Sequence, residues 1–192
     1  MSVKTLIDDI IGFYLWQGKD WLLFTYLFTI AVSVIISLVG IKKRFKKSQI
    51  VCSCLLIFWV ITVITLTVLC RETGNRWRYD LTPLWSWRRA LSGNRRGILM
   101  VAENILLLMP IGFLLPLTDR NRFTTGLTVL TGFLFSLGIE LCQFLLKRGQ
   151  LEVDDLINNT FGVLIGCLIS RVVLFLLNYF SSKKSAENKS VL

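Results

Sequence analysis

Ten polar residues lie in or beside the long apolar runs of this chain, where they are costly and where they can do chemistry. An aspartate at the centre of a membrane helix costs roughly 2.5 to 3.5 kcal/mol on insertion scales. Carboxylates and amides in such places support proton transfer, and arginines bind anionic groups. The carboxylates and amides of this set are Glu103, Asn104, Glu140, Gln143, Asp154, Asp155, Asn158 and Asn159, and the arginines beside them are Arg71 and Arg148.

The residue types that the chain contains, and those that it lacks, restrict the reactions that these polar residues could carry out. The sequence has no histidine, which excludes Ser-His-Asp triads, His-ligated zinc and histidine bases. Its five cysteines lack C-x-x-C spacing, and we interpret them as small apolar packing residues. We therefore consider Glu140 as a general base, Arg71 and Arg148 as ligands of a phosphate or pyrophosphate, and Asp154 and Asp155 as ligands of a divalent cation.

The composition places these residues in a membrane protein. Apolar residues make up 54% of the 192 positions, charged residues only 18%, and the mean hydropathy is +0.63. Backbone amides have no water to bond in the hydrocarbon region, so the spans must be helical. We predict an all-α, multi-pass membrane protein with about five transmembrane helices. The predicted spans are residues 21–41, 50–70, 98–117, 123–146 and about 156–180.

Two short segments flank the predicted membrane domain. Apolar residues at helical spacing predict an interfacial amphipathic segment at residues 1–20, whose acidic pair argues against a cleaved signal. Residues 21–180 form one helical membrane domain. The Lys/Ser-rich residues 181–192 are expected to be a disordered cytoplasmic tail.

The basic residues predict an orientation. The compact cluster at residues 42–47 favours the cytoplasmic side, which places the N-terminus outside and the C-terminus in the cytoplasm. Residues 71–97 hold seven arginines and would then lie outside, so total charge does not decide the topology. We weight the cluster at 42–47 more heavily.

Aromatic and basic residues alternate within residues 71–97. This mixture suits the lipid headgroup zone, where aromatic rings anchor and guanidinium groups pair with phosphate. Two interpretations remain, ordinary interfacial anchoring and the capture of an anionic headgroup. The net charge of +10 does not indicate nucleic-acid binding in a protein with five spans. The residues are Trp77, Tyr79, Trp85 and Trp87 with Arg76, Arg78, Arg88 and Arg89.

The polar residues fall at one depth. Glu103 and Asn104 lie roughly 8 Å into the third span at about 1.5 Å per residue, and Glu140 and Gln143 lie at a similar depth from the same face. Asn158 and Asn159 come just below that face in the fifth span, and Asp154 and Asp155 lie at its edge. We therefore expect three helices to present polar groups to one pocket near a single membrane boundary.

Spacing also places these residues on common helix faces. Glu140 and Gln143 are three apart, and Asp155 precedes Asn158 by three residues and Asn159 by four, so we expect each set to share a face. The amides have an alternative role as interhelical hydrogen-bonding groups. Two further features are predicted to be architectural. They are the small-xxx-small pair Gly162 and Gly166, and a kink at Pro110.

Several motifs between residues 71 and 166 resemble those of one family. They are N-x-x-L-x-x-P-x-G-F at 104–113, E-x-x-Q at 140–143, R-x-x-x-E-V-D-D-x-x-x-N-T-x-G at 148–162, Arg71 at the end of a span, and D-L-T-P-L at 80–84. Together they resemble the VanZ-like membrane proteins, named for a teicoplanin-resistance protein, with a core here at about 71–180. The chain departs from the family pattern at Glu152, which replaces an aspartate, and at Asp80, Thr82 and Leu84 in a family N-L-I-P-F segment.

The resemblance implies a multi-pass protein of the cell envelope, linked in some members to reduced susceptibility to glycopeptides such as teicoplanin. VanZ-like domains have been grouped by analogy with intramembrane enzymes that act on lipid headgroups. Our leading hypothesis is therefore an outer-leaflet site that binds a phosphate-bearing lipid and transfers or hydrolyses its headgroup. A second hypothesis is a non-catalytic protein that binds or shields a lipid-linked cell-wall precursor. A transporter or channel is less favoured, because the polar residues cluster at one end of the spans.

Overall fold

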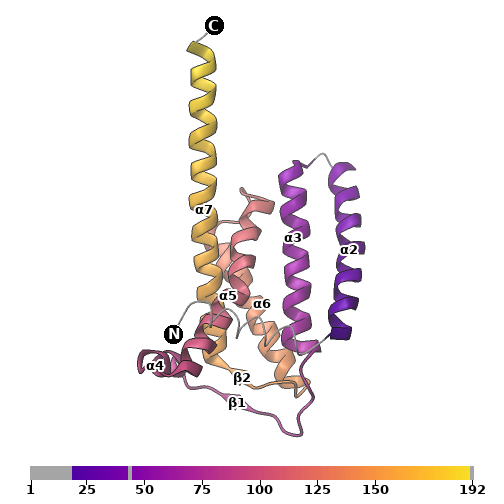
Figure 1. The fold of residues 1–192 in the computed structure, drawn as a ribbon, viewed down its shortest axis with the longest axis vertical. Helices are drawn as coiled ribbons and strands as arrows, with labels where there is room; N and C mark the ends of the chain where they lie inside the picture. The colour runs from indigo at the N-terminus through magenta and orange to yellow at the C-terminus, as the bar shows by residue number, and fades with distance from the viewer. Residues whose placement is uncertain (1–18, 43–44, 191–192) are drawn as a thin grey trace.

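The computed structural model describes residues 19–42 and 45–190, and within them five helices are long and apolar enough to cross a membrane. The all-α, multi-pass prediction is confirmed (Figure 1). These helices are α2 (Lys19–Lys42), α3 (Lys47–Ile64), α5 (Arg95–Thr118), α6 (Thr125–Leu145) and α7 (Val153–Ser190). A π-helical turn, η1 (Thr65–Leu69), continues α3.

The segments predicted at the two ends of the chain are described only in part. Almost all of the predicted interfacial segment, residues 1–18, lies outside the described residues. At the other end α7 continues as helix to Ser190, through the segment where we expected a disordered tail. The helical backbone therefore extends past Phe180, where the apolar span ends.

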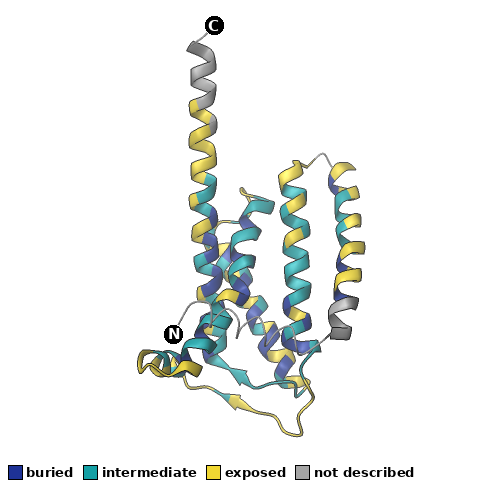
Figure 2. Ribbon diagram, viewed as in Figure 1, coloured by how far each residue is buried: buried dark blue, intermediate teal, exposed yellow. Residues whose placement is uncertain are grey.

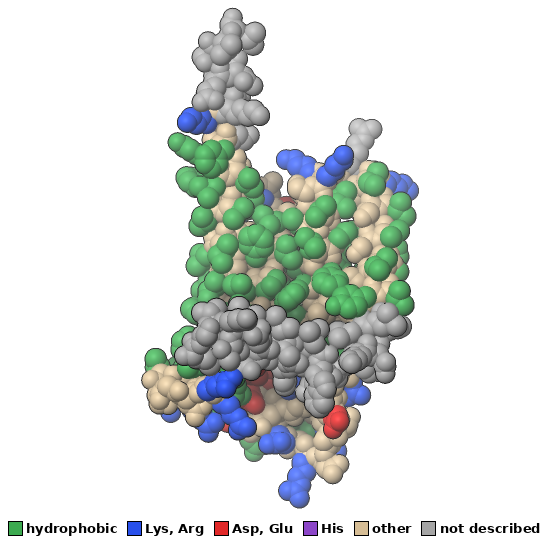
Figure 3. All heavy atoms as spheres, viewed as in Figure 1, with side chains coloured by type: hydrophobic (Ala, Val, Ile, Leu, Met, Phe, Trp, Pro, Cys, Tyr) green, Lys and Arg blue, Asp and Glu red, His purple; other side chains and the backbone are tan. Residues whose placement is uncertain are grey.

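The outer surface of the bundle is that of a membrane protein. Figure 3 shows apolar side chains across the middle of the bundle and Lys or Arg side chains toward both of its ends. Large apolar side chains are exposed there, for example Leu27 and Leu38 on α2 and Leu134 on α6. Buried residues face the interior (Figure 2). This pattern is expected where lipid replaces water around the spans.

Local sequence signals set the helix ends near the site. The side chain of Asn94 accepts hydrogen bonds from the backbone N–H groups of Arg96 and Gly97, so α5 begins at Arg95. Thr124 caps α6 in the same way, by accepting from Leu127 N–H. Helix α5 continues through both Pro110 and Pro116.

Helices α5 and α7 are packed against each other at glycines. A Cβ built on Gly112 of α5 would lie 2.0 Å from the carbonyl oxygen of Val163, and one on Gly166 of α7 would lie 2.0 Å from that of Met109. A Cβ on Gly162 would lie 2.2 Å from the carbonyl oxygen of Ile105. The predicted close packing at Gly162 and Gly166 is thus confirmed, and its partner is α5.

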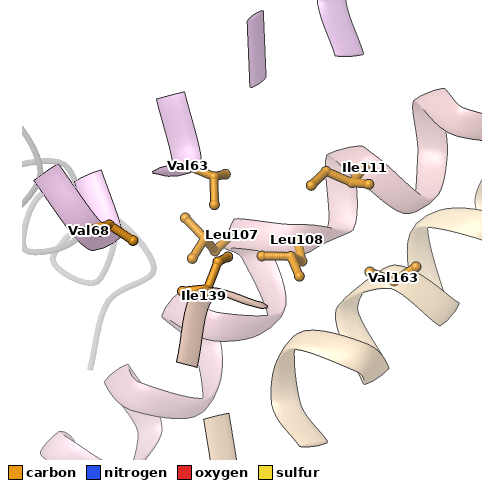
Figure 4. Close-up of a cluster of buried hydrophobic side chains, with 7 residues drawn as sticks. All are labelled: Val63, Val68, Leu107, Leu108, Ile111, Ile139 and Val163. Carbon is orange, nitrogen blue, oxygen red and sulfur yellow. The ribbon is translucent and has the colours of Figure 1, made fainter. Parts of the chain in front are cut away.

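The buried apolar core is formed by side chains from α5, α6 and α7 together with the end of α3 and η1. Figure 4 shows its seven side chains. The indole Nε1 of Trp59 donates to the carbonyl oxygen of Leu107 at 2.8 Å and joins α3 to α5. The core residues are Val63, Val68, Leu107, Leu108, Ile111, Ile139 and Val163.

Short elements close one end of the bundle. They are the strands β1 (Tyr79–Asp80) and β2 (Leu151–Glu152) and the helix α4 (Trp85–Leu91). The strands pair in parallel, with Tyr79 opposite Leu151 and Asp80 opposite Glu152. Figure 1 shows this end of the molecule opposite the C-terminus. Because α7 starts directly after β2, this end also holds the first turns of α7, where the polar residues cluster.

Candidate functional site

Seven of the ten polar residues singled out in the sequence line one small cavity of about 70 Å³. The cavity is enclosed by α5, α6, α7 and η1, together with Arg71 just beyond η1. Polar side chains from separate spans thus meet at the end of the bundle that carries β1 and β2. The seven residues are Arg71, Glu103, Asn104, Glu140, Gln143, Asp155 and Asn159.

Hydrogen bonds between helices hold the cavity walls. Asn104 Nδ2 on α5 donates to Asp155 Oδ1 on α7 at 2.5 Å. Asn159 Nδ2, four residues further along α7, donates to Ser136 Oγ on α6 at 2.9 Å. Only 2% of Asn159 is exposed, and its Oδ1 has no hydrogen-bond partner among the described residues. A buried acceptor atom that lines a cavity and has no donor among the described residues is suited to accept a hydrogen bond from a ligand.

Glu140 on α6 is one of the three carboxylates that line the cavity. Only 3% of the residue is exposed, and its Oε2 accepts the backbone N–H of Glu152 at 2.9 Å. That bond joins α6 to β2, directly before α7 begins. Glu140 is thereby held in the position expected for an acid–base group, with its carboxylate aimed into an enclosed space.

The π-helical turn η1 is a part of the site that the sequence did not indicate. Its backbone carbonyls are available to side chains from the end of α6. Gln143 Nε2 donates to Thr67 O at 3.0 Å, and Arg148 Nη1 donates to Val68 O and Leu69 O at 3.3 Å. Such turns are frequent at functional sites. Here the turn ends at Leu69, two residues before Arg71, and so determines the path of the chain from α3 to that arginine.

A larger hollow of about 730 Å³ lies next to the cavity, and we call it the vestibule. Arg71 lines both hollows. Gly149 leaves room for this side chain, because a Cβ there would lie 2.9 Å from Arg71 Nη1. Five cations and two carboxylates line the vestibule, which gives it an excess of positive charge. They are Arg71, Arg76, Arg78, Lys147 and Arg148 with Glu72 and Glu152.

Backbone contacts tie the two loops of the vestibule together. Gly74 N–H donates to Lys147 O at 2.7 Å, and Leu151 N–H donates to Arg78 O at 3.0 Å, next to the β1–β2 pair. Lys147 Nζ lies 4.0 Å from the centroid of the Trp77 ring, a cation–π contact at the rim. These contacts therefore hold in place the two loops that carry the basic side chains.

Comparison with known families identifies the chain. The VanZ/LLP1 family model matches residues 49–177, well over half of the sequence. The chain belongs to the VanZ/LLP1 family. The match runs from the start of α3 into the second half of α7 and so contains every element around the cavity and the vestibule, whereas α2 lies before it. Neither the search of curated proteins nor that of solved structures found a match.

The VanZ/LLP1 segment is longer than its motifs indicated. The motifs predicted a core at about 71–180, and the matched region adds most of α3 and η1. Since the carbonyl of Thr67 accepts from Gln143, these added residues belong to the wall of the cavity. The family segment therefore comprises four of the five membrane helices.

Glu152, the main departure from the VanZ-like motif, proves to be a site residue that the sequence did not indicate. It lines the vestibule just before α7 begins. Burial raises the pKa of Glu152 to about 7, and the neighbouring carboxylates of Asp155, Asp80 and Asp154 also raise it, whereas Arg71 lowers it. The charge of the vestibule therefore changes near neutral pH.

Two predicted site residues of this VanZ/LLP1 protein lie elsewhere. Asp154 Oδ2 accepts the backbone N–H of Ser86 at 2.9 Å, and Asn158 Oδ1 accepts from Trp87 Nε1 at 2.6 Å. Asn158 Nδ2 also donates to Ser86 Oγ at 3.2 Å. Asp154 and Asn158 are fully buried in these contacts and do not line the cavity. The hydrogen bonds of Asp154 and Asn158 hold α4 against the first turns of α7.

The structure gives no support to a divalent cation held by Asp154 and Asp155. The two residues are adjacent on α7, but Asp154 faces α4 and Asp155 faces Asn104 on α5. Within the described residues no group of three or more His, Cys, Asp or Glu is arranged to hold a metal ion.

Ser136 is a further residue that the sequence analysis missed. It lies four residues before Glu140 on α6 and is fully buried against Asn159. Its i, i+4 spacing to Glu140 is the feature of the sequence that could have indicated it. A single small hydroxyl in an apolar helix is common, so the signal became specific only when α7 was placed beside it.

Proposed function

We propose that this VanZ/LLP1 protein binds the phosphate of a lipid headgroup in the vestibule and transfers or hydrolyses that headgroup. The observation that supports this most strongly is the pairing of a cationic vestibule with a carboxylate and amide cavity that shares Arg71 with it. Guanidinium groups bind phosphate through short, charge-assisted hydrogen bonds. The vestibule lies at an end of the apolar bundle, where headgroups are found.

In this proposal Glu140 is the proton acceptor. It takes a proton from the attacking hydroxyl or water, whose oxygen forms the new bond to phosphorus as the bond between phosphorus and the departing alcohol breaks. Arg71 stands at the boundary and stabilises the negative charge of the phosphate as the reaction proceeds. Gln143 and Arg148 hold the carbonyls of η1 and so fix the segment that leads to Arg71.

The orientation belongs to the same proposal. With the N-terminus outside, the vestibule faces the outer leaflet and the C-terminus lies in the cytoplasm. Leu91, at the end of α4, is 84% exposed and suits a single cysteine label in a variant without the native cysteines. Labelling of Leu91→Cys in intact cells agrees with this orientation, and labelling only after permeabilisation contradicts it.

Replacing two vestibule arginines tests the phosphate site. We expect Arg76→Gln with Arg78→Gln to weaken the retention of a phosphodiester lipid about tenfold, because charge-assisted hydrogen bonds are lost. Native mass spectrometry of the full-length protein in lipid nanodiscs measures this retention. The matched control is Arg88→Gln with Arg89→Gln on α4, which removes the same charge outside the vestibule. An equal loss in both double variants indicates general surface charge and contradicts a phosphate site.

The pKa of Glu152 predicts a pH dependence of this retention. Below a pH of about 7 Glu152 is protonated and neutral, and above it the carboxylate repels phosphate. We therefore expect retention of a phosphodiester lipid, whose own charge is constant, to fall as the pH rises from 6 to 8. Glu152→Gln is expected to give a flat profile at the high level. The same fall in Glu152→Gln would show that another group titrates.

The non-catalytic hypothesis has one structural observation in its favour. The amides of Asn104, Gln143 and Asn159 each donate to a protein acceptor, as expected for a rigid binding frame. A protein that only shields a lipid-linked cell-wall precursor needs no proton acceptor. The Glu140→Gln variant described in the Discussion separates the two hypotheses.

A further inference from the structure

The cavity and the vestibule differ in the kind of group that they can bind. The vestibule is lined by five cations, whereas the cavity has three carboxylates, Glu103, Glu140 and Asp155, and shares only Arg71 with the vestibule. Asn159 Oδ1 adds a buried acceptor without a donor among the described residues. The group that completes the cavity is therefore one that donates hydrogen bonds and tolerates negative surroundings.

The size and the lining of the cavity restrict this group further. A volume of about 70 Å³ holds two or three water-sized groups at about 30 Å³ each. Quaternary ammonium groups are recognised by cages of aromatic rings. None of the described residues that line the cavity is aromatic. The apolar part of the lining is instead aliphatic, formed by Leu66, Leu107 and Ile139.

We propose that the bound headgroup carries a primary amine beside its phosphate, as in phosphoethanolamine, with the ammonium in the cavity and the phosphate in the vestibule. This inference rests on the proposed function and names its substrate class. A primary ammonium supplies three N–H donors. They match Asn159 Oδ1 and the carboxylates of Asp155 and Glu140.

The arrangement selects against methylated amines for two reasons. Each N-methyl group removes a donor and adds volume to a cavity that has little to spare. A trimethylammonium group has no N–H and leaves Asn159 Oδ1 unsatisfied. A headgroup with a glycerol hydroxyl in place of the amine lacks the positive charge that faces the carboxylates.

A lipid series on the wild-type protein tests the inference without any mutation. Full-length protein in nanodiscs is offered phosphatidylethanolamine, its N-methyl and N,N-dimethyl forms, phosphatidylcholine and phosphatidylglycerol at equal fractions. Native mass spectrometry is expected to show retention falling with each methyl group, with phosphatidylethanolamine retained about tenfold more than phosphatidylcholine. Soluble phosphoethanolamine is added as a competitor. Displacement of the lipid by it shows that the headgroup alone suffices, and its failure to compete while the lipid preference holds assigns the site to lipid.

Asp155→Asn provides the second readout. The variant keeps an oxygen for the Asn104 bond but loses the charge that faces the ammonium, so the preference for ethanolamine over choline should fall to about twofold or less. The matched control is Asp119→Asn, a carboxylate to amide change at the opposite end of α5, which should keep the preference. If Asp155→Asn does not fold, the lipid series decides alone.

The failures of the two proposals can be told apart. Equal retention of phosphatidylethanolamine and phosphatidylcholine, with the loss on Arg76→Gln and Arg78→Gln intact, overturns the amine inference and leaves the phosphate site standing. Absence of any retained phosphate-bearing lipid overturns both. A preference for ethanolamine that survives in Asp155→Asn also overturns the assignment of the ammonium to the cavity.

Discussion

Glu140→Gln is expected to lower headgroup transfer or hydrolysis by at least about 100-fold while leaving the protein folded. Positioned acid–base groups contribute factors of about 10² to 10⁴. Glutamine has nearly the same shape, and its Oε1 can accept the backbone N–H of Glu152 that Glu140 Oε2 accepts now. The substitution therefore removes the proton acceptor and keeps the contact between α6 and β2.

The measurement is turnover by purified protein in nanodiscs, with headgroup release or exchange followed by mass spectrometry. Asp119→Asn, outside both hollows, is the control and should retain wild-type turnover. Unchanged turnover in Glu140→Gln would remove the catalytic role of Glu140. If the variant also keeps lipid retention and any protection of cells against a glycopeptide, the non-catalytic shielding hypothesis is the better one.

Alanine at Gly112 or Gly166 is expected to prevent close packing of α5 against α7 and to lower the yield of folded protein sharply. At both positions the new Cβ would lie 2.0 Å from a backbone carbonyl oxygen of the other helix. A side chain can rotate away from such a contact, but the backbone of a packed helix cannot. Overpacking costs about 1 to 3 kcal/mol where neighbours can shift, and more is expected here.

The control for this prediction is available in the same chain. Gly126 and Gly138 of α6 have nothing within 4 Å of an added Cβ, so Gly126→Ala and Gly138→Ala should be tolerated. Thermal unfolding of the detergent-solubilised proteins, followed by circular dichroism, measures the difference. A midpoint for Gly112→Ala equal to that of Gly138→Ala would contradict the packing of α5 on α7. Because Asp155 and Asn159 lie on α7 close to this contact, loss of the packing should also abolish lipid retention.

Much of this architecture follows from the sequence, because the membrane leaves few choices. Runs of about 20 apolar residues must be helical in lipid, so the five spans were predictable and are confirmed. Polar residues in such runs are costly, so Asn104, Glu140 and Asn159 could be singled out as candidate site residues from the sequence, and they line one cavity. The close packing at Gly162 and Gly166 was also predictable, although its partners on α5, Ile105 and Met109, were not identified.

Which neighbouring residue enters the site was decided only by tertiary structure. Successive residues on a helix point about 100° apart, so Asp154 and Asp155 cannot face the same partner. The packing of α7 sends Asp155 to the cavity and Asp154 to α4. Asn158 and Asn159 divide in the same way, and no periodicity in the sequence tells which of each pair faces inward.

The sequence by itself determined the spans, the chemical groups of the site and the end of the bundle at which they gather, because these follow from the cost of polar groups in lipid. Tertiary structure decided the π-helical turn at Thr65–Leu69, the raised pKa of Glu152 and the separation of a cationic vestibule from an acidic cavity. Each of these features depends on which side chains pack against one another across helices. The spacing of residues in the sequence does not specify that packing.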